Sequence, residues 1–72
     1  MREKRDVVEE GLTTVAEAAR FLCISRSSLY ALMDAGGLVY VKLGRARRIP
    51  RRALVDLAAD NLTGGWKQGE GR

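Results

Sequence analysis

The fold is decided by residues 14–37, which read TVAEAARFLCISRSSLYALMDAGG. The first four match the capping box, in which the hydroxyl of Thr14 and the carboxylate of Glu17 accept hydrogen bonds from amides that the start of a helix leaves without partners. Apolar residues then recur at the spacing i, i+3, i+4 and i+7, which aligns them on one face of a helix: Val15, Ala18, Ala19 and Leu22. The pattern predicts a helix from Thr14 to about Cys23.

A second helix is predicted from Ser25 to about Ala35. Ser25 is a typical N-cap, and Gly36-Gly37 is typical of a helix end, where the chain adopts positive φ. Two short helices joined by about three residues have the proportions of a helix-turn-helix. We expect Leu29, Leu32 and Met33 to be buried with Ile24 as an anchor, and the opposite face to carry Arg26, Ser27, Tyr30 and Asp34.

A small hairpin is predicted after the second helix. In residues 38–43, LVYVKL, the apolar Val39, Val41 and Leu43 alternate with Tyr40 and Lys42, which is the period of a strand. Residues 44–45, Gly-Arg, suit a two-residue type II′ turn, which takes glycine first. Residues 46–49 would form the returning strand, and the hairpin would be a wing beside the helices.

A third helix is predicted from Pro50, because proline is well suited to the first turn of a helix. Its apolar face would comprise Leu54, Leu57 and Ala58, with Leu62 one turn further on. The predicted fold is therefore mainly α with a small β-hairpin, a winged helix-turn-helix of three helices and a wing over residues 12–62. Residues 1–11 are expected to form a flexible charged arm and residues 63–72 a flexible tail. In that tail, Trp66 either folds back on the third helix or docks on a partner protein.

The positive charge is concentrated on one segment. The net charge is +4, and no acidic residue lies between Asp34 and Asp56. A run of like charges can be a solvated face, but these positives are not interleaved with negatives and repel one another. Such one-sided charge is typical of phosphate binding. The residues concerned are Lys42, Arg45, Arg47, Arg48, Arg51 and Arg52.

The composition argues against an enzyme, a metal site and a cofactor. With one cysteine and no histidine, the chain has no internal disulfide and lacks the usual zinc and non-haem iron ligand sets. It has no nucleophile–histidine pair and no phosphate-cradling P-loop, and its carboxylates are scattered. Nothing approaches the roughly 20 apolar residues of a membrane span. The lone cysteine and the lack of a signal peptide favour the reducing cytoplasm, where we expect the protein to be associated with the nucleoid.

Three segments together resemble the excisionase-family, MerR-like helix-turn-helix domain: residues 12–22, LTTVAEAARFL, residues 24–30, ISRSSLY, and residues 44–50, GRARRIP. They occur in order over residues 12–62, and they are specific only in combination. The resemblance implies a winged helix with its second helix in the major groove of DNA and its wing on neighbouring phosphates or in the minor groove. The family includes recombination directionality factors, which steer a phage or element integrase toward excision, and small transcription regulators.

One residue departs from the family pattern. The family commonly has glycine in the turn between the first two helices, where this chain has Cys23. If that position needs positive φ, cysteine is strained there by about 1 kcal/mol or more; otherwise the turn is relaxed into an allowed region. Because no second cysteine or histidine is present, a zinc or redox role for Cys23 is disfavoured against that of a small, half-buried hydrophobic residue.

The candidate DNA-binding residues fall on the second helix, on the wing and on the third helix. Arg26 either reads guanine with two hydrogen bonds or only touches phosphate, and the ring of Tyr30 packs against the wing, its hydroxyl donates to a phosphate, or both. Arg47 either contacts DNA or turns back to pair with an acid such as Asp56. The recognition-helix candidates are Ser25, Arg26, Ser27 and Tyr30, the wing candidates are Lys42, Arg45, Arg47 and Arg48, and Arg51 and Arg52 are possible phosphate contacts because they oppose the dipole of the third helix.

Three hypotheses for the function follow. The first is an excisionase-like accessory or architectural factor that binds duplex DNA cooperatively at repeated sites, with further copies of itself and an integrase or recombinase as partners. The second is a stand-alone transcription regulator. The third is an RNA-binding or protein-binding module of the antitoxin or adaptor kind. The lack of aromatic residues among the basic ones argues against recognition of single-stranded RNA.

Overall fold

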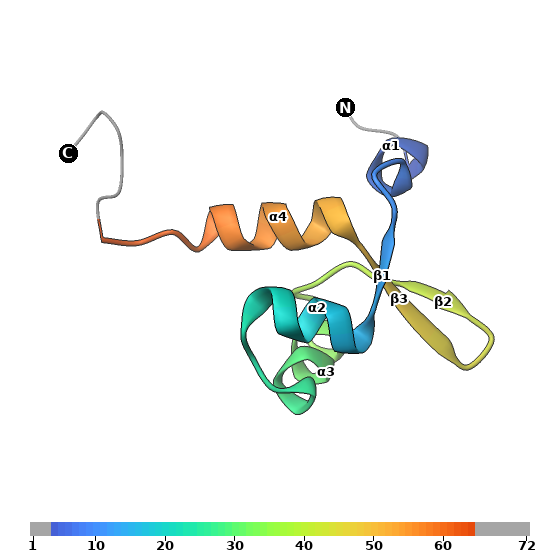
Figure 1. Ribbon diagram of the computed structural model, residues 1–72, viewed down its shortest axis with the longest axis horizontal. Helices are drawn as coiled ribbons and strands as arrows, with labels where there is room; N and C mark the ends of the chain where they lie inside the picture. The colour runs from blue at the N-terminus through green and yellow to red at the C-terminus, as the bar shows by residue number, and fades with distance from the viewer. Residues whose placement is uncertain (1–3, 65–72) are drawn as a thin grey trace.

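The computed structural model describes residues 4–64. The elements follow in the order α1 (Lys4–Val8), β1 (Leu12–Thr14), α2 (Val15–Leu22), α3 (Arg26–Asp34), β2 (Val41–Leu43), β3 (Ala46–Pro50) and α4 (Arg51–Asp60) (Figure 1). The strands form an antiparallel sheet in the order β1-β3-β2. The predicted winged helix-turn-helix is confirmed: α2 and α3 are the paired helices, β2 and β3 form the wing, and α4 is the third predicted helix.

Helix α2 begins with the predicted capping box. The amide of Glu17 donates to Thr14 Oγ1 at 3.0 Å, and the amide of Thr14 donates to Glu17 Oε1 at 2.9 Å. The hydrogen bond from the Thr14 amide is the largest cause that lowers the pKa of Glu17, and the charges of Arg20 and Arg51 act in the same direction. Because the folded pKa is lowered, this contribution to stability is present at neutral pH and is lost as the pH falls through that pKa.

Helix α2 ends in a Schellman motif centred on Cys23. This residue has φ 58° and ψ 41°, which is the left-handed conformation. Its amide donates to the carbonyl of Arg20 at 3.1 Å, and the amide of Ile24 donates to the carbonyl of Ala19 at 3.0 Å, the two bonds that define the motif. The position therefore does require positive φ, and cysteine occupies it with strain. Its side chain is exposed rather than half-buried, with Sγ 3.6 Å from the carbonyl oxygen of Arg20.

Helix α3 starts at its predicted cap and packs against α2. The hydroxyl of Ser25 accepts from the amide of Ser28 at 3.1 Å. Leu29 and Met33 are buried, and Ile24 and Leu32 are partly buried against the same cluster, as expected. The fully buried residues Ala18, Leu29, Ile49 and Leu54 show that α2, α3, β3 and α4 share one core.

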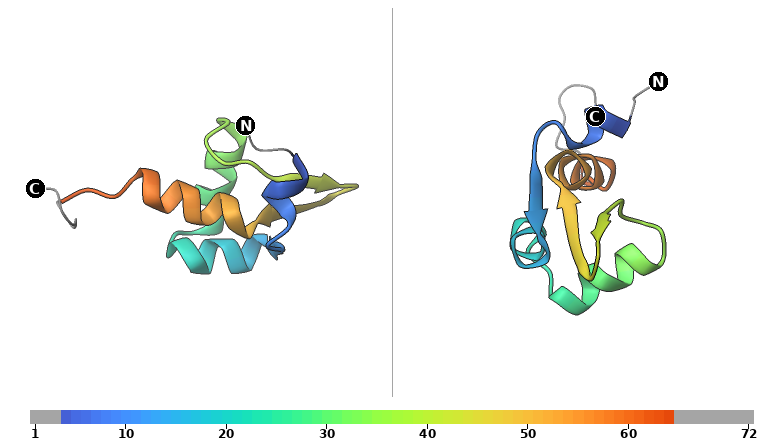
Figure 2. Two further views of the ribbon diagram at one scale, coloured as in Figure 1. Left: turned by 90° about the horizontal axis from the view of Figure 1, so that it is seen from above. Right: turned by 90° about the vertical axis from the view of Figure 1, so that its right-hand side faces the viewer.

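The wing is shorter than predicted on its first strand. Strand β2 comprises only residues 41–43, because Leu38 turns into the core and residues 39–40 pair with no strand. The predicted two-residue turn is confirmed, because Leu43 pairs with Ala46. Gly44 has φ 65° and Arg45 does not have positive φ, which agrees with the signs of φ in a type II′ turn. The hairpin projects beyond the helices, while α2 and α4 lie side by side behind it (Figure 2).

The sheet has a third strand that the sequence pattern did not predict. Thr13 of β1 pairs with Ile49 of β3, and its buried hydroxyl donates to the carbonyl of Ile49 at 2.9 Å. This strand is three residues long, and two of them are threonines with no alternation of apolar side chains. Its position comes from pairing with β3, which the local sequence does not reveal.

The segment predicted as a charged arm contains a short helix. Residues 4–8 form α1, which packs against α4. Glu10 forms an ion pair with Arg52 at 3.0 Å, and the amide of Arg51 donates to the carbonyl of Gly11 at 2.9 Å. These contacts hold the segment against the start of α4. The predicted tail lies mostly outside the described residues, and so does Trp66.

The strain at Cys23 leads to a stability prediction. Substituting Cys23→Gly should raise the free energy of unfolding by about 1 kcal/mol, because glycine adopts positive φ without a Cβ clash. Urea unfolding followed by circular dichroism measures the change. The matched control is Cys23→Ala, which also removes the sulfur but keeps Cβ and the strain, and it should remain within about 0.5 kcal/mol of the parent chain. Equal stabilisation by both variants would show that the sulfur, and not the backbone, is responsible.

Candidate nucleic-acid interface

A basic groove lies between the start of α2, helix α3 and the hairpin. Helix α3 supplies one wall with Arg26 and Tyr30, and the turn and strand β3 supply the other. None of the described residues that line the groove is acidic. They are Thr14, Val15, Ala16, Arg26, Tyr30, Arg45, Ala46, Arg47 and Arg48. The fold thus brings five of the predicted DNA-binding residues, distant in sequence, to one surface.

The remaining recognition-helix candidates lie beside this groove without lining it. Ser25 is the N-cap of α3, and its hydroxyl also donates to Ser28 Oγ at 3.0 Å. Ser27 is exposed in the first turn of α3, next to Arg26. A helix start of this kind presents free amides and short polar side chains outward, which suits contact with phosphates or base edges.

Arg47 contacts an acid and two aromatic rings. Its Nη1 atom lies 3.2 Å from Asp34 Oδ1, and its side chain is only 23% exposed. The guanidinium carbon lies 5.1 Å from the ring centre of Tyr30 and 4.7 Å from that of Tyr40, both within the range of cation–π attraction. Arg47 therefore turns back to an acid, as one predicted alternative held, but the acid is Asp34 and not Asp56. The predicted packing of the Tyr30 ring against the wing is confirmed by the same contact.

Two of the other wing residues are exposed, and the third is half-buried. Arg45 is exposed in the turn, and Lys42 is exposed on β2 directly opposite Arg47. Arg48 is half-buried and donates from Nη1 to the carbonyl of Arg47 at 2.8 Å. The exposed charge of the wing is thus concentrated at its tip.

Comparison with known proteins identifies the family. The family described as "Helix-turn-helix domain" matches residues 14–61, which include both paired helices, the wing and α4. The chain belongs to this helix-turn-helix family.

A curated relative specifies the kind of helix-turn-helix domain. A "Probable excisionase" from Saccharopolyspora erythraea is 50% identical to this chain over 48 residues, which cover 67% of this chain and 49% of the relative. The chain spans about half the length of that relative. No solved structure gives a significant match. The resemblance to excisionase-family helix-turn-helix DNA-binding domains is therefore confirmed.

The two arginines at the start of α4 lie outside the basic groove. Arg52 lies 3.0 Å from Glu10 and 3.7 Å from Asp56, so its charge is balanced by two carboxylates. Arg51 is exposed and lines a separate shallow hollow with Glu17 and Arg20. Neither of the two lines the basic groove.

Tyr40 and Asp34 are site residues that the sequence analysis did not select. The spacing of both residues indicates the face on which each lies. Asp34 is four residues after Tyr30 on the polar face of α3, and Tyr40 is two residues before Lys42 on the predicted strand. Residues at such spacings share a face. The spacing does not predict that these two faces both contact Arg47.

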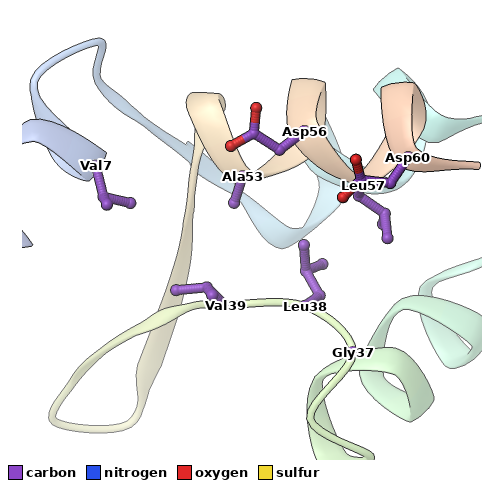
Figure 3. A pocket seen from close by; sticks show the side chains of 8 residues that line it. All are labelled: Val7, Gly37, Leu38, Val39, Ala53, Asp56, Leu57 and Asp60. Atoms are coloured by element: carbon purple, nitrogen blue, oxygen red, sulfur yellow. The ribbon is translucent and has the colours of Figure 1, made fainter. Parts of the chain in front are cut away.

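A second hollow of the helix-turn-helix domain is apolar with an acidic rim. Figure 3 shows Leu38 pointing from the loop toward Ala53 and Leu57 of α4. Two carboxylates, Asp56 and Asp60, belong to its lining, and it shares no residue with the basic groove. The domain therefore presents positive charge at the groove and negative charge at this hollow.

Two further findings concern residues 4–64 only. No three histidine, cysteine, aspartate or glutamate side chains in this range gather closely enough to hold a metal ion. No helix in this range is long and apolar enough to cross a membrane.

Proposed function

We propose that this domain binds duplex DNA sequence-specifically and acts without catalysis as an excisionase-like accessory factor. Helix α3 would enter the major groove, and the β2–β3 hairpin would contact phosphates beside it. The observation that carries the proposal is the basic groove, in which Arg26 and Tyr30 of α3 face Arg45 and Arg48 of the hairpin without an acidic lining residue among those described. Positive charge so placed attracts the phosphate backbone, and an exposed helix start reaches base edges.

The recognition helix and the wing have different roles in this proposal. Arg26 is exposed in the first turn of α3, where a guanidinium can donate two hydrogen bonds to O6 and N7 of guanine. Ser27 beside it can contact a base or a phosphate, Ser25 caps the helix, and the hydroxyl of Tyr30 donates to a phosphate. Arg45 and Lys42, exposed on the hairpin, neutralise phosphates without reading sequence.

The size of the domain favours action by several copies. A single module of this kind buries roughly 600–1,000 Å² of protein surface on DNA, which is small for tight and selective binding. Cooperative binding at repeated sites would supply the missing affinity. The 50% identity to a probable excisionase supports a role in recombination, in which the natural partner would be an integrase or recombinase.

The first prediction separates base reading from phosphate contact. Arg26→Ala should relax sequence preference at one base pair, with about 1–3 kcal/mol of discrimination lost. Arg45→Ala should weaken binding to all duplexes alike and make the log–log salt slope shallower by about 1. Binding to matched and point-substituted duplexes, measured by fluorescence anisotropy from 50 to 200 mM salt, gives both quantities.

A matched control for these variants is Arg20→Ala, because Arg20 is an exposed arginine that lines a different hollow. It should change neither sequence preference nor salt slope. If Arg26→Ala leaves the preferred sequence unchanged, α3 is not the reading helix.

The second prediction concerns the arrangement of sites. Genomic fragments selected by the purified protein should contain repeats about 10 bp apart, one helical turn, and footprints should fill them cooperatively. A fragment cut to one repeat should bind more weakly than the same repeat within the array. Sites beside an integrase attachment region support the excision factor, sites at promoters indicate a transcription regulator, and no enriched duplex contradicts DNA binding.

A further inference from the structure

An ion pair between Asp34 and Arg47 puts an acidic residue beside the proposed DNA-binding groove. Arg47 lines the basic groove, yet its Nη1 atom lies 3.2 Å from the carboxylate of Asp34, a residue of the recognition helix whose side chain is 65% exposed. A carboxylate at such a position repels phosphate. Its presence there therefore calls for a role in organising the groove.

Arg47 is held by the helix and the wing at once. Its own backbone belongs to β3, Tyr30 and Asp34 belong to α3, and Tyr40 belongs to the segment leading into β2. The two tyrosine rings attract the guanidinium through their faces, and Asp34 accepts from its N–H edge. Three segments that are distant in sequence thus converge on one cation.

Asp34 also reduces the repulsion between two cations that lie opposite each other on the hairpin. Lys42 and Arg47 lie directly opposite each other in the antiparallel pair. Like charges in that arrangement repel each other. A carboxylate on Arg47 offsets this repulsion and leaves Lys42 exposed for an outside anion.

We infer that Asp34 withholds Arg47 from the DNA phosphates, so that Arg47 acts as a positioning residue that fixes the wing against the recognition helix. This inference rests on the proposed DNA binding. Nη1 of Arg47 already donates to Asp34, and the carboxylate offsets the charge that would otherwise attract a phosphate. The angle between α3 and the wing is then set before DNA is bound, which lowers the ordering required on binding.

The experiment measures the salt dependence of binding in a set of variants. Each phosphate neutralised contributes about 0.9 to the log–log slope. Arg47→Met keeps an unbranched stem but removes the charge, and its slope should equal that of the parent chain even if binding weakens. Asp34→Asn removes the negative charge that holds and offsets Arg47, so that Arg47 can turn to a phosphate. The slope should then be steeper by about 0.9, so that a fourfold rise in salt reduces affinity by about 3.5-fold more than in the parent chain.

Two controls separate positioning from general charge. Asp60→Asn makes the same change in net charge at the apolar hollow between α4 and the loop before β2, and its slope should stay at the parent value. In the double variant Asp34→Asn/Arg47→Met, the steeper slope should disappear. A slope that is equally steep without Arg47 would mean that Asp34 merely repels DNA, and the inference would be wrong.

The remaining outcomes are also distinct. If Arg47→Met makes the slope shallower by about 0.9, Arg47 contacts a phosphate in the parent chain and the inference fails while DNA binding stands. If Arg47→Met does not fold, Asp34→Asn alone decides the question, because it replaces an exposed side chain by one of the same shape. An unchanged slope in Asp34→Asn would then overturn the inference. If the parent chain itself binds no duplex, the proposed function fails first.

Discussion

The central position of β3 between β1 and β2 is the constraint on which the rest of the structure depends. Its inner end is fixed by pairing with β1 and by the hydrogen bond from the Thr13 hydroxyl to the carbonyl of Ile49. Since side chains alternate along a strand, the burial of Ile49 places Arg47 on the same face, two residues nearer the tip. That face meets α3, so the residue that completes the core also determines that Arg47 reaches Tyr30 and Asp34.

The elements that the sequence predicted well are those whose signals are local. Helices α2 and α3 each combine a cap, an apolar stripe and a defined end, and all three agree. The elements that were missed, α1 and β1, are five and three residues long. They are too short to show a period, and they are held by partners far along the chain: β1 by Ile49, and the segment before it by Arg52. Long-range pairing of this kind cannot be inferred from one sequence.

The same distinction applies to the candidate site. The predicted hairpin brings Arg45, Arg47 and Arg48 to the groove, and the predicted polar face of α3 supplies Arg26 and Tyr30. The state of each cation was not predictable, because it depends on which acid lies nearby in space. Arg47 faces Asp34, 13 residues before it, and Arg52 faces Glu10, 42 residues before it. A sequence gives the number of charges but not the number that remain available to a ligand.

That difference between total and available charge bears on how such a domain can act. Within the basic segment, Arg47 and Arg52 are ion-paired and Arg48 donates to the backbone, whereas Lys42, Arg45 and Arg51 are exposed. Each phosphate contact contributes to affinity and makes it more sensitive to salt. A domain that uses part of its charge to order its own wing has fewer such contacts per copy, but presents them in a fixed geometry. In the proposed function, affinity would then come from the number of copies bound, and selectivity from the geometry within each one.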